Sequence, residues 1–192
     1  MKNTIIEYIS DVKRLCDSLD AEQIDKACGL ILEKYKAGKQ IFVAGNGGSA
    51  GTANHFSCDF GKNAVKGDEN KPKIISISAN IEVLTALGND FSYADVFSEQ
   101  MKNLFNDGDL ILLISASGNS PNVLKAAEYA KKRGGKVIGF TGFSGGKLKD
   151  LSDICINIPS DSYEKIEDLH MMLAHMVVCW FKALELGNKE VV

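Results

Sequence analysis

The sequence lacks the features that mark several large classes of protein. Its longest strongly apolar stretch, residues 171–181, contains His175 and is too short to cross a membrane. The N-terminal segment has Glu7 and Asp11 where a secretory signal needs an unbroken apolar core. With 22 Lys and Arg against 25 Asp and Glu, the chain has no basic excess for binding nucleic acid. We therefore expect a cytoplasmic protein that binds neither membranes nor nucleic acid directly and whose ligand is small.

Cysteine and proline are also scarce. The five cysteines form no C-x-x-C pair, and their odd number does not suit a disulfide framework, so we expect buried thiols in a reducing compartment. Only three prolines occur, and no repeat, low-complexity segment or Ser/Pro-rich linker divides the chain. Its 192 residues are the length of one domain. The prediction is a single domain over residues 1–192, in which helices at 1–37 lie at an oligomer interface.

What the chain does contain is an alternation of short apolar runs with helical periodicity. Residues 1–37 have apolar side chains at helical spacing in two successive stretches, which predicts two amphipathic helices forming an N-terminal hairpin. Later β-branched runs separated by helices are typical of a parallel sheet buried on both faces. We predict a three-layer, doubly wound α/β fold. Its strands are expected at 40–44, 73–78, 109–115, 136–141 and 154–158, and its later helices at 49–62, 81–88, 94–105, 121–133 and 163–186.

A serine-rich turn follows the third predicted strand. Ser120 is placed to be the N-cap of the next helix, and Pro121 its first residue. The hydroxyls of Ser115, Ser117 and Ser120 then lie beside free backbone N–H groups at a helix start, which suits a phosphate group. The alternative is an ordinary capped turn, although three serines exceed what a cap needs.

Two other turns have weaker patterns. In GNGGS, residues 45–49, Asn46 and the glycines permit positive φ and a close approach of the backbone to a ligand. This turn is neither a Walker loop nor a dinucleotide fingerprint, because G-K-[ST] and G-x-G-x-x-G are both absent. On local grounds, Asp90 is an Asx-type cap for a helix that starts near Tyr93.

The three histidines fall in two of the predicted helices. His55 and Asp59 are four residues apart and therefore lie on one side of the first of these helices. Glu167 and His175 lie on the last helix, with His170 between them. Two imidazoles and two carboxylates are a ligand set suited to a divalent metal such as zinc. Helical histidines are more often ordinary surface or core residues, but His175 interrupts an apolar stripe, where a buried imidazole needs a partner.

Five segments, in order, resemble the sugar isomerase (SIS) domain family: AGNGGSAGTANHF, LGNDFSYADVFSEQM, SASGNSPNVLKAA, TGFSGGKL and IEDLHMMLAH. Within that family the chain is similar to the phosphoheptose isomerases, which convert sedoheptulose 7-phosphate to D-glycero-D-manno-heptose 7-phosphate. The resemblance covers nearly the whole chain. It implies one SIS domain with a five-stranded parallel sheet, a homotetramer with active sites between subunits, and a role in lipopolysaccharide or capsule biosynthesis.

The resemblance also implies roles for individual residues. The serine-rich turn would hold the sugar phosphate, Asp59 would be the base and His175 the acid of an isomerisation through an enediol. One zinc ion per subunit would be bound by His55, Asp59, Glu167 and His175. The implied substrate contacts are Asn46, Gly47, Gly48, Ser49, Asp59, Asn89, Asp90, Ser115, Ala116, Ser117, Ser120 and Glu167.

Two positions depart from the family pattern. The chain has Asp59 where the family isomerases usually have glutamate, and Glu167 where they have glutamine. The shorter carboxylate reaches about 1 Å less far, and a second carboxylate favours a bound cation. Two other hypotheses therefore stay open. One is a non-catalytic adaptor of the same fold that binds a phosphosugar or a replication initiator, and the other is an isomerase of a shorter or modified sugar phosphate.

Overall fold

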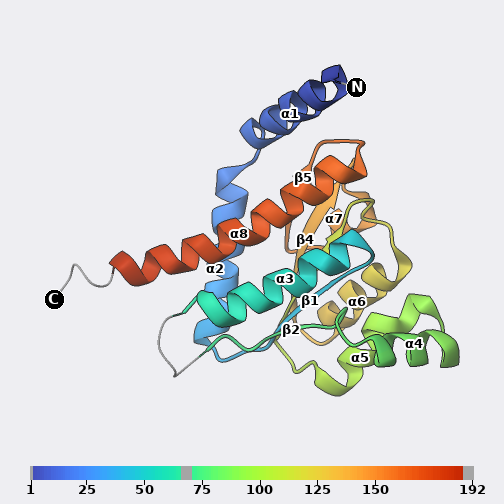
Figure 1. Ribbon diagram of the computed structural model, residues 1–192. Helices are drawn as coiled ribbons and strands as arrows, with labels where there is room; N and C mark the ends of the chain where they lie inside the picture. The colour runs from blue at the N-terminus through green and yellow to red at the C-terminus, as the bar shows by residue number, and fades with distance from the viewer. Residues whose placement is uncertain (1, 66–70, 188–192) are drawn as a thin grey trace.

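A sheet of five parallel strands forms the middle layer of the protein, with helices on both of its faces (Figure 1). The structure, a computed structural model, describes residues 2–65 and 71–187, so parts of the expected domain 1–192 lie outside the described residues. The strand order is β2-β1-β3-β4-β5, and the predicted doubly wound α/β fold is confirmed. The strands are β1 (Ile41–Gly45), β2 (Ile74–Ser76), β3 (Leu110–Ser115), β4 (Lys136–Gly142) and β5 (Ile154–Ile158).

Alternation along the strands creates two cores, one on each face of the sheet. Successive side chains of a strand point to opposite faces, so Val43 and Leu112 pack in one core and Phe42 and Ile111 in the other. The first core is covered by α2 (Ala21–Lys36), α3 (Gly48–Asn63) and α8 (Tyr163–Gly187). The second is covered by α4 (Ile81–Asp90), α5 (Val96–Leu104), α6 (Pro121–Lys132) and α7 (Gly146–Leu151).

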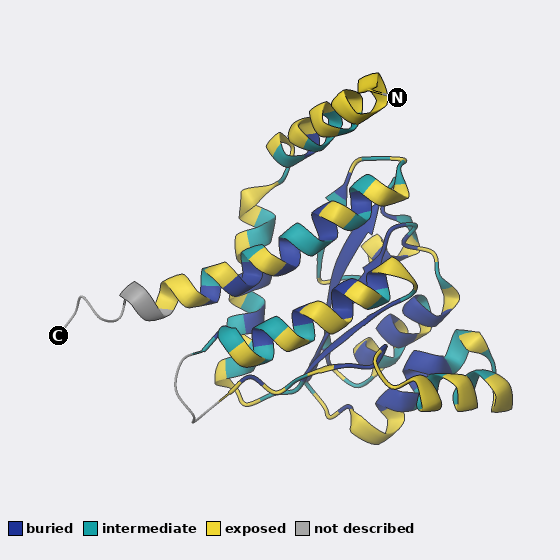
Figure 2. Ribbon diagram, in the orientation of Figure 1, coloured by how far each residue is buried: buried dark blue, intermediate teal, exposed yellow. Residues whose placement is uncertain are grey.

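The predicted elements differ from the observed ones mainly at the edges of the sheet. β1 and β3 are buried along their whole length, as predicted, because they have neighbours on both sides (Figure 2). β2 has only three residues, and its Ile75 is 38% exposed, because it is an edge strand with one neighbour. The sequence pattern did not reveal α7, because six residues are too few for helical periodicity.

The expectation of buried thiols holds for only part of the cysteines. Cys28 is fully buried in the first core, and this desolvation raises its pKa to about 12. Cys58 on α3 and Cys179 on α8 are exposed instead. An apolar neighbourhood in the sequence does not decide which side of a helix faces the core, so this expectation was wrong for these two residues.

The first helix, α1 (Lys2–Asp17), extends away from the sheet and touches the body of the protein near α8 (Figure 1). Tyr8 donates a hydrogen bond to Asp168 at 2.6 Å, and Lys165 forms an ion pair with Asp11 at 2.5 Å. Figure 2 shows most of α1 as exposed. Its exposed isoleucines are Ile5 (63%), Ile6 (55%) and Ile9 (50%). No helix of the described residues is both long and apolar enough to cross a membrane.

Candidate functional site

Two strand-to-helix turns meet at the carboxyl edge of the sheet. β1 and β3 are neighbours, but the helices that follow them, α3 and α6, cover opposite faces, so a crevice opens between the two turns. The GNGGS turn follows β1, and the serine-rich turn follows β3. A cavity of about 160 Å³ lies here, lined by Asn46, Ser49, Ile114, Ser115, Ala116, Ser117, Ser120, Tyr163 and Glu167.

The serine-rich turn leaves the hydroxyl of Ser120 without a capping role. Ser120 is the N-cap residue of α6 and Pro121 follows it, as predicted, but the Ser120 side chain makes no capping hydrogen bond. Its Oγ lies 3.4 Å from the Oγ of Ser115 instead. The cavity therefore contains hydroxyl groups next to the N-terminus of a twelve-residue helix, an arrangement that favours a bound anion.

Glu167 on α8 packs directly against the GNGGS turn. A Cβ atom added to Gly48 would lie 2.0 Å from Oε2 of Glu167, so any larger residue would have to displace this carboxylate. Gly47, the N-cap residue of α3, has a φ of 55°, which favours glycine as well. The glycines of the turn thus allow a carboxylate from the other end of the chain to reach the cavity.

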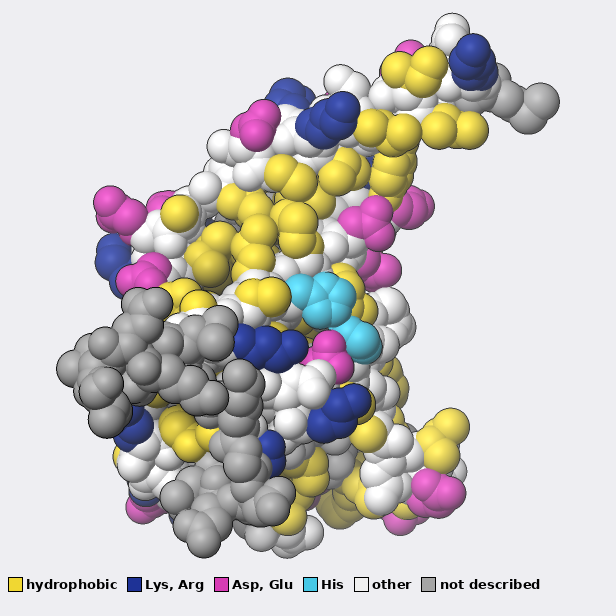
Figure 3. Space-filling model, turned by 60° about the vertical axis from the view of Figure 1, so that its left-hand side comes forward, with side chains coloured by type: hydrophobic (Ala, Val, Ile, Leu, Met, Phe, Trp, Pro, Cys, Tyr) yellow, Lys and Arg dark blue, Asp and Glu magenta, His cyan; other side chains and the backbone are white. Residues whose placement is uncertain are grey.

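A second cluster of polar side chains joins α3 to α8 at the protein surface. Nε2 of His55 lies 2.8 Å from Nε2 of His175 and 3.3 Å from Oδ2 of Asp59, which is 4.0 Å from Nε2 of His175. Asn63 donates a 3.4 Å hydrogen bond to the other oxygen of Asp59. Figure 3 shows histidine side chains beside an acidic one on the surface. The side chains of His55, Asp59 and His175 are close enough to share one metal ion.

The structure brings together only part of the predicted four-residue metal set. Glu167 does not belong to the cluster of His55, Asp59 and His175. It precedes His175 by eight residues, or roughly 12 Å along the helix axis. His175 is not buried in the apolar stripe that it interrupts, because its side chain is 50% exposed. The buried histidine of α8 is His170.

Comparisons with known proteins show the family to which the chain belongs. Residues 7–142 match the family model of the SIS domain. The phosphoheptose isomerase of Aliarcobacter butzleri is 36% identical over 180 residues, which cover 92% of this chain and 95% of that protein. The phosphoheptose isomerase of Clostridium acetobutylicum is 35% identical over 179 residues, with 93% and 90% covered. The chain belongs to the phosphoheptose isomerase family of SIS domain proteins.

Solved structures of the same family have the same fold. The phosphoheptose isomerase of Neisseria gonorrhoeae superimposes with a TM-score of 0.87 at 28% identity and covers 95% of this chain and 98% of its own. That of Francisella tularensis superimposes with a TM-score of 0.83 at 29% identity, covering 93% and 95%. The resemblance predicted from the five sequence segments is confirmed.

His170 is a core residue of this SIS domain. It is 0% exposed, and its Nε2 donates a hydrogen bond to the carbonyl oxygen of Thr141 at 3.1 Å. Its Nδ1 has no hydrogen-bond partner among the described residues, so the ring is neutral with its proton on Nε2. Burial lowers the pKa of His170 to about 4, because desolvation disfavours the imidazolium more than the bond to Thr141 favours it.

This histidine should make the stability of the protein depend on pH. Its ordinary pKa is 6.5, so between pH 6.5 and about 4 the unfolded chain binds a proton that the folded chain does not. The contribution of neutral His170 to the free energy of unfolding is complete above pH 6.5 and is lost as the pH falls toward 4. The variant His170→Gln keeps an N–H donor for Thr141 but does not titrate. From pH 7 to pH 4, we expect wild type to lose about 3 kcal/mol more unfolding free energy than this variant.

Urea unfolding of both proteins over this pH range measures the difference. Carboxylates titrate in both proteins, so they cancel in the comparison. If the difference in unfolding free energy between wild type and His170→Gln does not change with pH, the assignment of a neutral buried imidazole is contradicted.

The sequence did not indicate three residues that border the cavity. Tyr163, the first residue of α8, lines it directly and packs on Phe143 with ring centroids 5.1 Å apart. Tyr93 and Asn122 both form hydrogen bonds with Asn46. These contacts join residues 47 and 76 positions apart, and no local spacing pattern reports such distant pairs. Their only sequence signal is that each lies at the start of a helix that follows a turn.

Asn89 and Asp90 lie near this site but do not line the cavity. Asp90 is the last residue of α4, where it accepts a 2.9 Å hydrogen bond from the Asn89 side chain. The next helical turn, η1 (Tyr93–Asp95), has Ser92 as its N-cap residue, so the interpretation of Asp90 as an Asx-type cap was wrong. Both side chains are exposed, and neither caps a helix.

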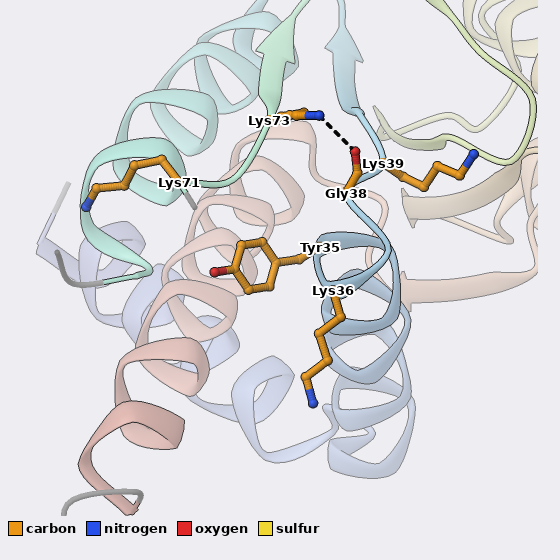
Figure 4. A pocket seen from close by; sticks show the side chains of 6 residues that line it. All are labelled: Tyr35, Lys36, Gly38, Lys39, Lys71 and Lys73. Carbon is orange, nitrogen blue, oxygen red and sulfur yellow. Dashed lines mark hydrogen bonds between the residues drawn. The ribbon is translucent and has the colours of Figure 1, made fainter. Parts of the chain in front are cut away.

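A larger cavity, of about 450 Å³, lies at the opposite edge of the sheet (Figure 4). Figure 4 shows its lysine side chains pointing in different directions instead of converging. Lys73 donates to the carbonyl oxygen of Gly38 at 3.1 Å, and Lys39 to that of Asp107 at 2.7 Å. These ammonium groups bind main-chain carbonyls, so the crevice between the β1 and β3 turns remains the candidate site.

Proposed function

We propose that the protein is an aldose–ketose isomerase that converts sedoheptulose 7-phosphate to D-glycero-D-manno-heptose 7-phosphate, within one SIS domain spanning residues 1–192. The main support is that α3 and α8 connect a phosphate-suited cavity to a carboxylate and imidazole cluster. From Glu167 in the cavity to His175 in the cluster, α8 runs roughly 12 Å. This is comparable to the length of an extended seven-carbon sugar phosphate. The product would supply lipopolysaccharide or capsule biosynthesis.

The proposed binding site uses the groups that the turns leave free. Hydroxyls of the serine-rich turn and the positive end of the α6 helix dipole hold the phosphate without a cationic side chain. The glycines of the GNGGS turn let the backbone approach the sugar. The residues assigned to the sugar are Asn46, Gly47, Gly48, Ser49, Asn89, Asp90 and Glu167.

In the proposed reaction, Asp59 and His175 move protons at neighbouring atoms of the sugar. The Asp59 carboxylate takes the proton from C1 of the open-chain ketose, and the electrons of that bond form the C1–C2 double bond of an enediol. His175 donates a ring proton to the oxygen on C2. Asp59 then returns its proton to C2, while the hydroxyl proton on O1 passes to His175. Each group ends in its starting protonation state.

The cluster also suits a zinc ion, which we propose as a resident metal. Two imidazoles and one carboxylate are three protein ligands, the number found in catalytic zinc sites that keep one position open. Ligand atoms of a tetrahedral zinc site are about 3.3 Å apart, so the distances of 3.3 and 4.0 Å fit, and the 2.8 Å distance must widen slightly. A zinc ion bound here would polarise an oxygen of the sugar. In this proposal Glu167 contacts the sugar unless α8 shifts toward the metal.

We also propose that the protein acts as a cytoplasmic homotetramer. The exposed isoleucines of α1 support this, because an apolar helix face that extends into water is typical of an interface. Light scattering should then give about four times the chain mass of 20.8 kDa. A monomer in solution at working concentration would contradict this part of the proposal.

Proton NMR of sedoheptulose 7-phosphate incubated with the protein in D₂O tests the function. We expect the aldose signal to grow and the product to carry deuterium at C2, because an enediol base exchanges its proton with solvent. Aldose without deuterium would show that Asp59 returns the same proton to C2 faster than that proton exchanges with solvent. Tight binding of the sugar phosphate without any product would favour the adaptor hypothesis. Repeating the assay after chelation and zinc repletion shows whether the reaction needs the metal.

The phosphate role of the serine-rich turn predicts a specific effect of Ser120→Ala. Because the hydroxyl makes no cap, its loss should leave the free energy of unfolding nearly unchanged. A lost hydrogen bond to a charged group should raise KM about tenfold or more. Asp20→Ala is the matched control, since Asp20 does cap α2 by accepting from Glu22 and Gln23. It should cost about 1 kcal/mol of stability and leave KM unchanged. The reverse pattern would show that Ser120 is only a cap.

A further inference from the structure

The start of α7 is capped by the serine-rich turn. The N-cap residue of α7 makes no side-chain hydrogen bond, so the first N–H groups of this helix need other acceptors. Leu148 donates its backbone N–H to the carbonyl oxygen of Gly118 at 2.9 Å, and Lys147 donates its backbone N–H to Oδ1 of Asn119 at 3.1 Å. The turn after β3 therefore depends on the helix that follows β4.

The side chain of Asn119 links this helix start to Ser117. Besides accepting from Lys147, it donates from Nδ2 to the carbonyl oxygen of Ser117 at 3.0 Å. A backbone N–H can only donate and a carbonyl oxygen can only accept, so these two partners fix which way the amide faces. The donor and the acceptor of this amide are both used, and together they hold the backbone at Ser117 against α7.

The backbone N–H of Asn119 determines how the hydroxyl of Ser117 can bind a ligand. This N–H donates to Oγ of Ser117 at 3.2 Å, so the oxygen is the acceptor and the hydroxyl proton is not used in this bond. Ser117 lines the cavity, where its proton can be donated to a ligand. In contrast, the Oγ atoms of Ser115 and Ser120 lie 3.4 Å apart and either can be the donor, so this contact does not fix the direction of their protons.

We infer that Asn119 is a positioning residue, which fixes the Ser117 hydroxyl as a hydrogen-bond donor to the phosphate group of the substrate. This inference rests on the proposed function and deepens it at the phosphate end of the sugar. Asn119 is exposed and is not among the residues that line the cavity, so it acts on the ligand through Ser117. The terminal oxygens of a phosphate dianion are acceptors, and a donor that is already oriented loses less conformational entropy on binding them.

The variant Asn119→Ala removes both side-chain bonds of this residue. Calorimetric titration with a seven-carbon sugar alcohol phosphate, which cannot isomerise, should give a dissociation constant about three- to tenfold higher than that of wild type. With sedoheptulose 7-phosphate as substrate, KM should rise by a similar factor and kcat should stay unchanged, because the phosphate is bound equally in the ground state and the transition state. A merely structural defect would instead lower kcat by reducing the fraction of folded protein.

Asn106→Ala is the matched control. Asn106 is also exposed, and it also donates from Nδ2 to the carbonyl oxygen of the residue two positions earlier, Leu104, at 3.3 Å. It lies before the start of β3, whereas the cavity lies beyond the end of this strand. Its replacement should leave the dissociation constant, KM and kcat unchanged. Equal weakening of phosphate binding in Asn106→Ala and Asn119→Ala would overturn the inference.

A double-mutant cycle with Ser117→Ala shows whether Asn119 acts through this hydroxyl. Ser117→Ala alone should weaken binding of the sugar alcohol phosphate about tenfold or more, because it removes a hydrogen bond to a charged group. Asn119→Ala added to Ser117→Ala should then weaken binding by less than about a further twofold. If Asn119→Ala weakens binding by the same factor with and without the Ser117 hydroxyl, the inference is wrong. It is also wrong if Asn119→Ala binds the sugar alcohol phosphate as tightly as wild type.

Failure of the wild-type protein to convert sedoheptulose 7-phosphate is a separate result, seen without any variant, and it counts against the proposed function. The titrations still test the role of Asn119 in that case, because they require phosphate binding and no turnover. A wild-type protein that does not bind the sugar alcohol phosphate would contradict the phosphate site itself, and the role of Asn119 with it.

Discussion

Replacing Asp59 with asparagine should reduce kcat for the isomerisation by about 10²- to 10⁴-fold, the usual contribution of a positioned general base. Asparagine has nearly the same shape as aspartate but no basic oxygen, so packing between α3 and α8 should not change. Oδ2 of Asp59 lies near both imidazoles of the cluster, and Asn63 holds the other oxygen at 3.4 Å. This carboxylate is therefore fixed in place while its side chain stays 27% exposed.

The Asp59→Glu variant separates the need for a carboxylate from the need for this particular side-chain length. It lengthens the side chain by one methylene group and moves the carboxylate about 1 Å, a displacement that can cost up to about 10²-fold in rate. We expect its activity to exceed that of Asp59→Asn. Higher activity in Asp59→Glu than in Asp59→Asn would show that the basic oxygen matters more than its position.

Binding and metal content must be measured on the same preparations. Thermal stabilisation by sedoheptulose 7-phosphate should be similar in wild type and Asp59→Asn, because the proposed phosphate site is the serine-rich turn. Zinc content should be compared as well, since Asp59 is also a proposed ligand. Full activity of Asp59→Asn would contradict its assignment as the base. Lost activity that returns when zinc is added would assign Asp59 to the metal instead.

Gly118→Ala should destabilise the protein by about 3–4 kcal/mol, combining backbone strain with overpacking. Gly118 has a φ of 61°, a conformation that L-residues with a side chain adopt at a cost. An added Cβ would lie 2.0 Å from the carbonyl oxygen of Gly145, an atom that cannot rotate away. Leu148 donates its N–H to the carbonyl oxygen of Gly118 at 2.9 Å, so a hydrogen bond also joins the serine-rich turn to α7.

Gly134→Ala is the matched control for this prediction. Gly134 has nearly the same φ, 65°, but an added Cβ there would meet nothing within 4 Å. Its replacement should cost only the strain of the left-handed conformation, about 1 kcal/mol. Chemical unfolding of both variants measures the two costs. Gly118→Ala should also raise KM, because separating Gly118 from Gly145 moves the serines that we propose to bind the phosphate. Equal losses of unfolding free energy in the two variants would show that the contact between Gly118 and Gly145 can widen with little loss of stability.

The sequence was sufficient to predict the order of the elements and the fold class. Buried strands in a parallel sheet need continuous apolar runs, and the helices between them need periodic apolar faces, so both are written locally in the chain. The serine-rich turn was predicted as a possible anion site for the same reason, because an N-cap, a proline and a helix start are neighbours in sequence. The edge strand β2 was less well predicted, since its pairing depends on its place in the sheet.

The composition of the site depended on contacts that no local pattern reports. His170 and His175 lie on one helix with similar neighbours in sequence, yet only the packing of α8 on the sheet shows that the first is buried and the second exposed. The same packing directs Glu167 to the GNGGS turn and leaves it outside the His55, Asp59 and His175 cluster.

The sequence by itself thus determined a doubly wound α/β fold with two ligand-suited turns, because hydrophobic periodicity and turn chemistry act over a few residues. Only the tertiary structure decided which side chains share the site. The Asn46–Asn122 amide pair and the Asp59–His175 cluster join residues 76 and 116 positions apart, and their geometry is set by the angle and register at which helices pack on a completed sheet.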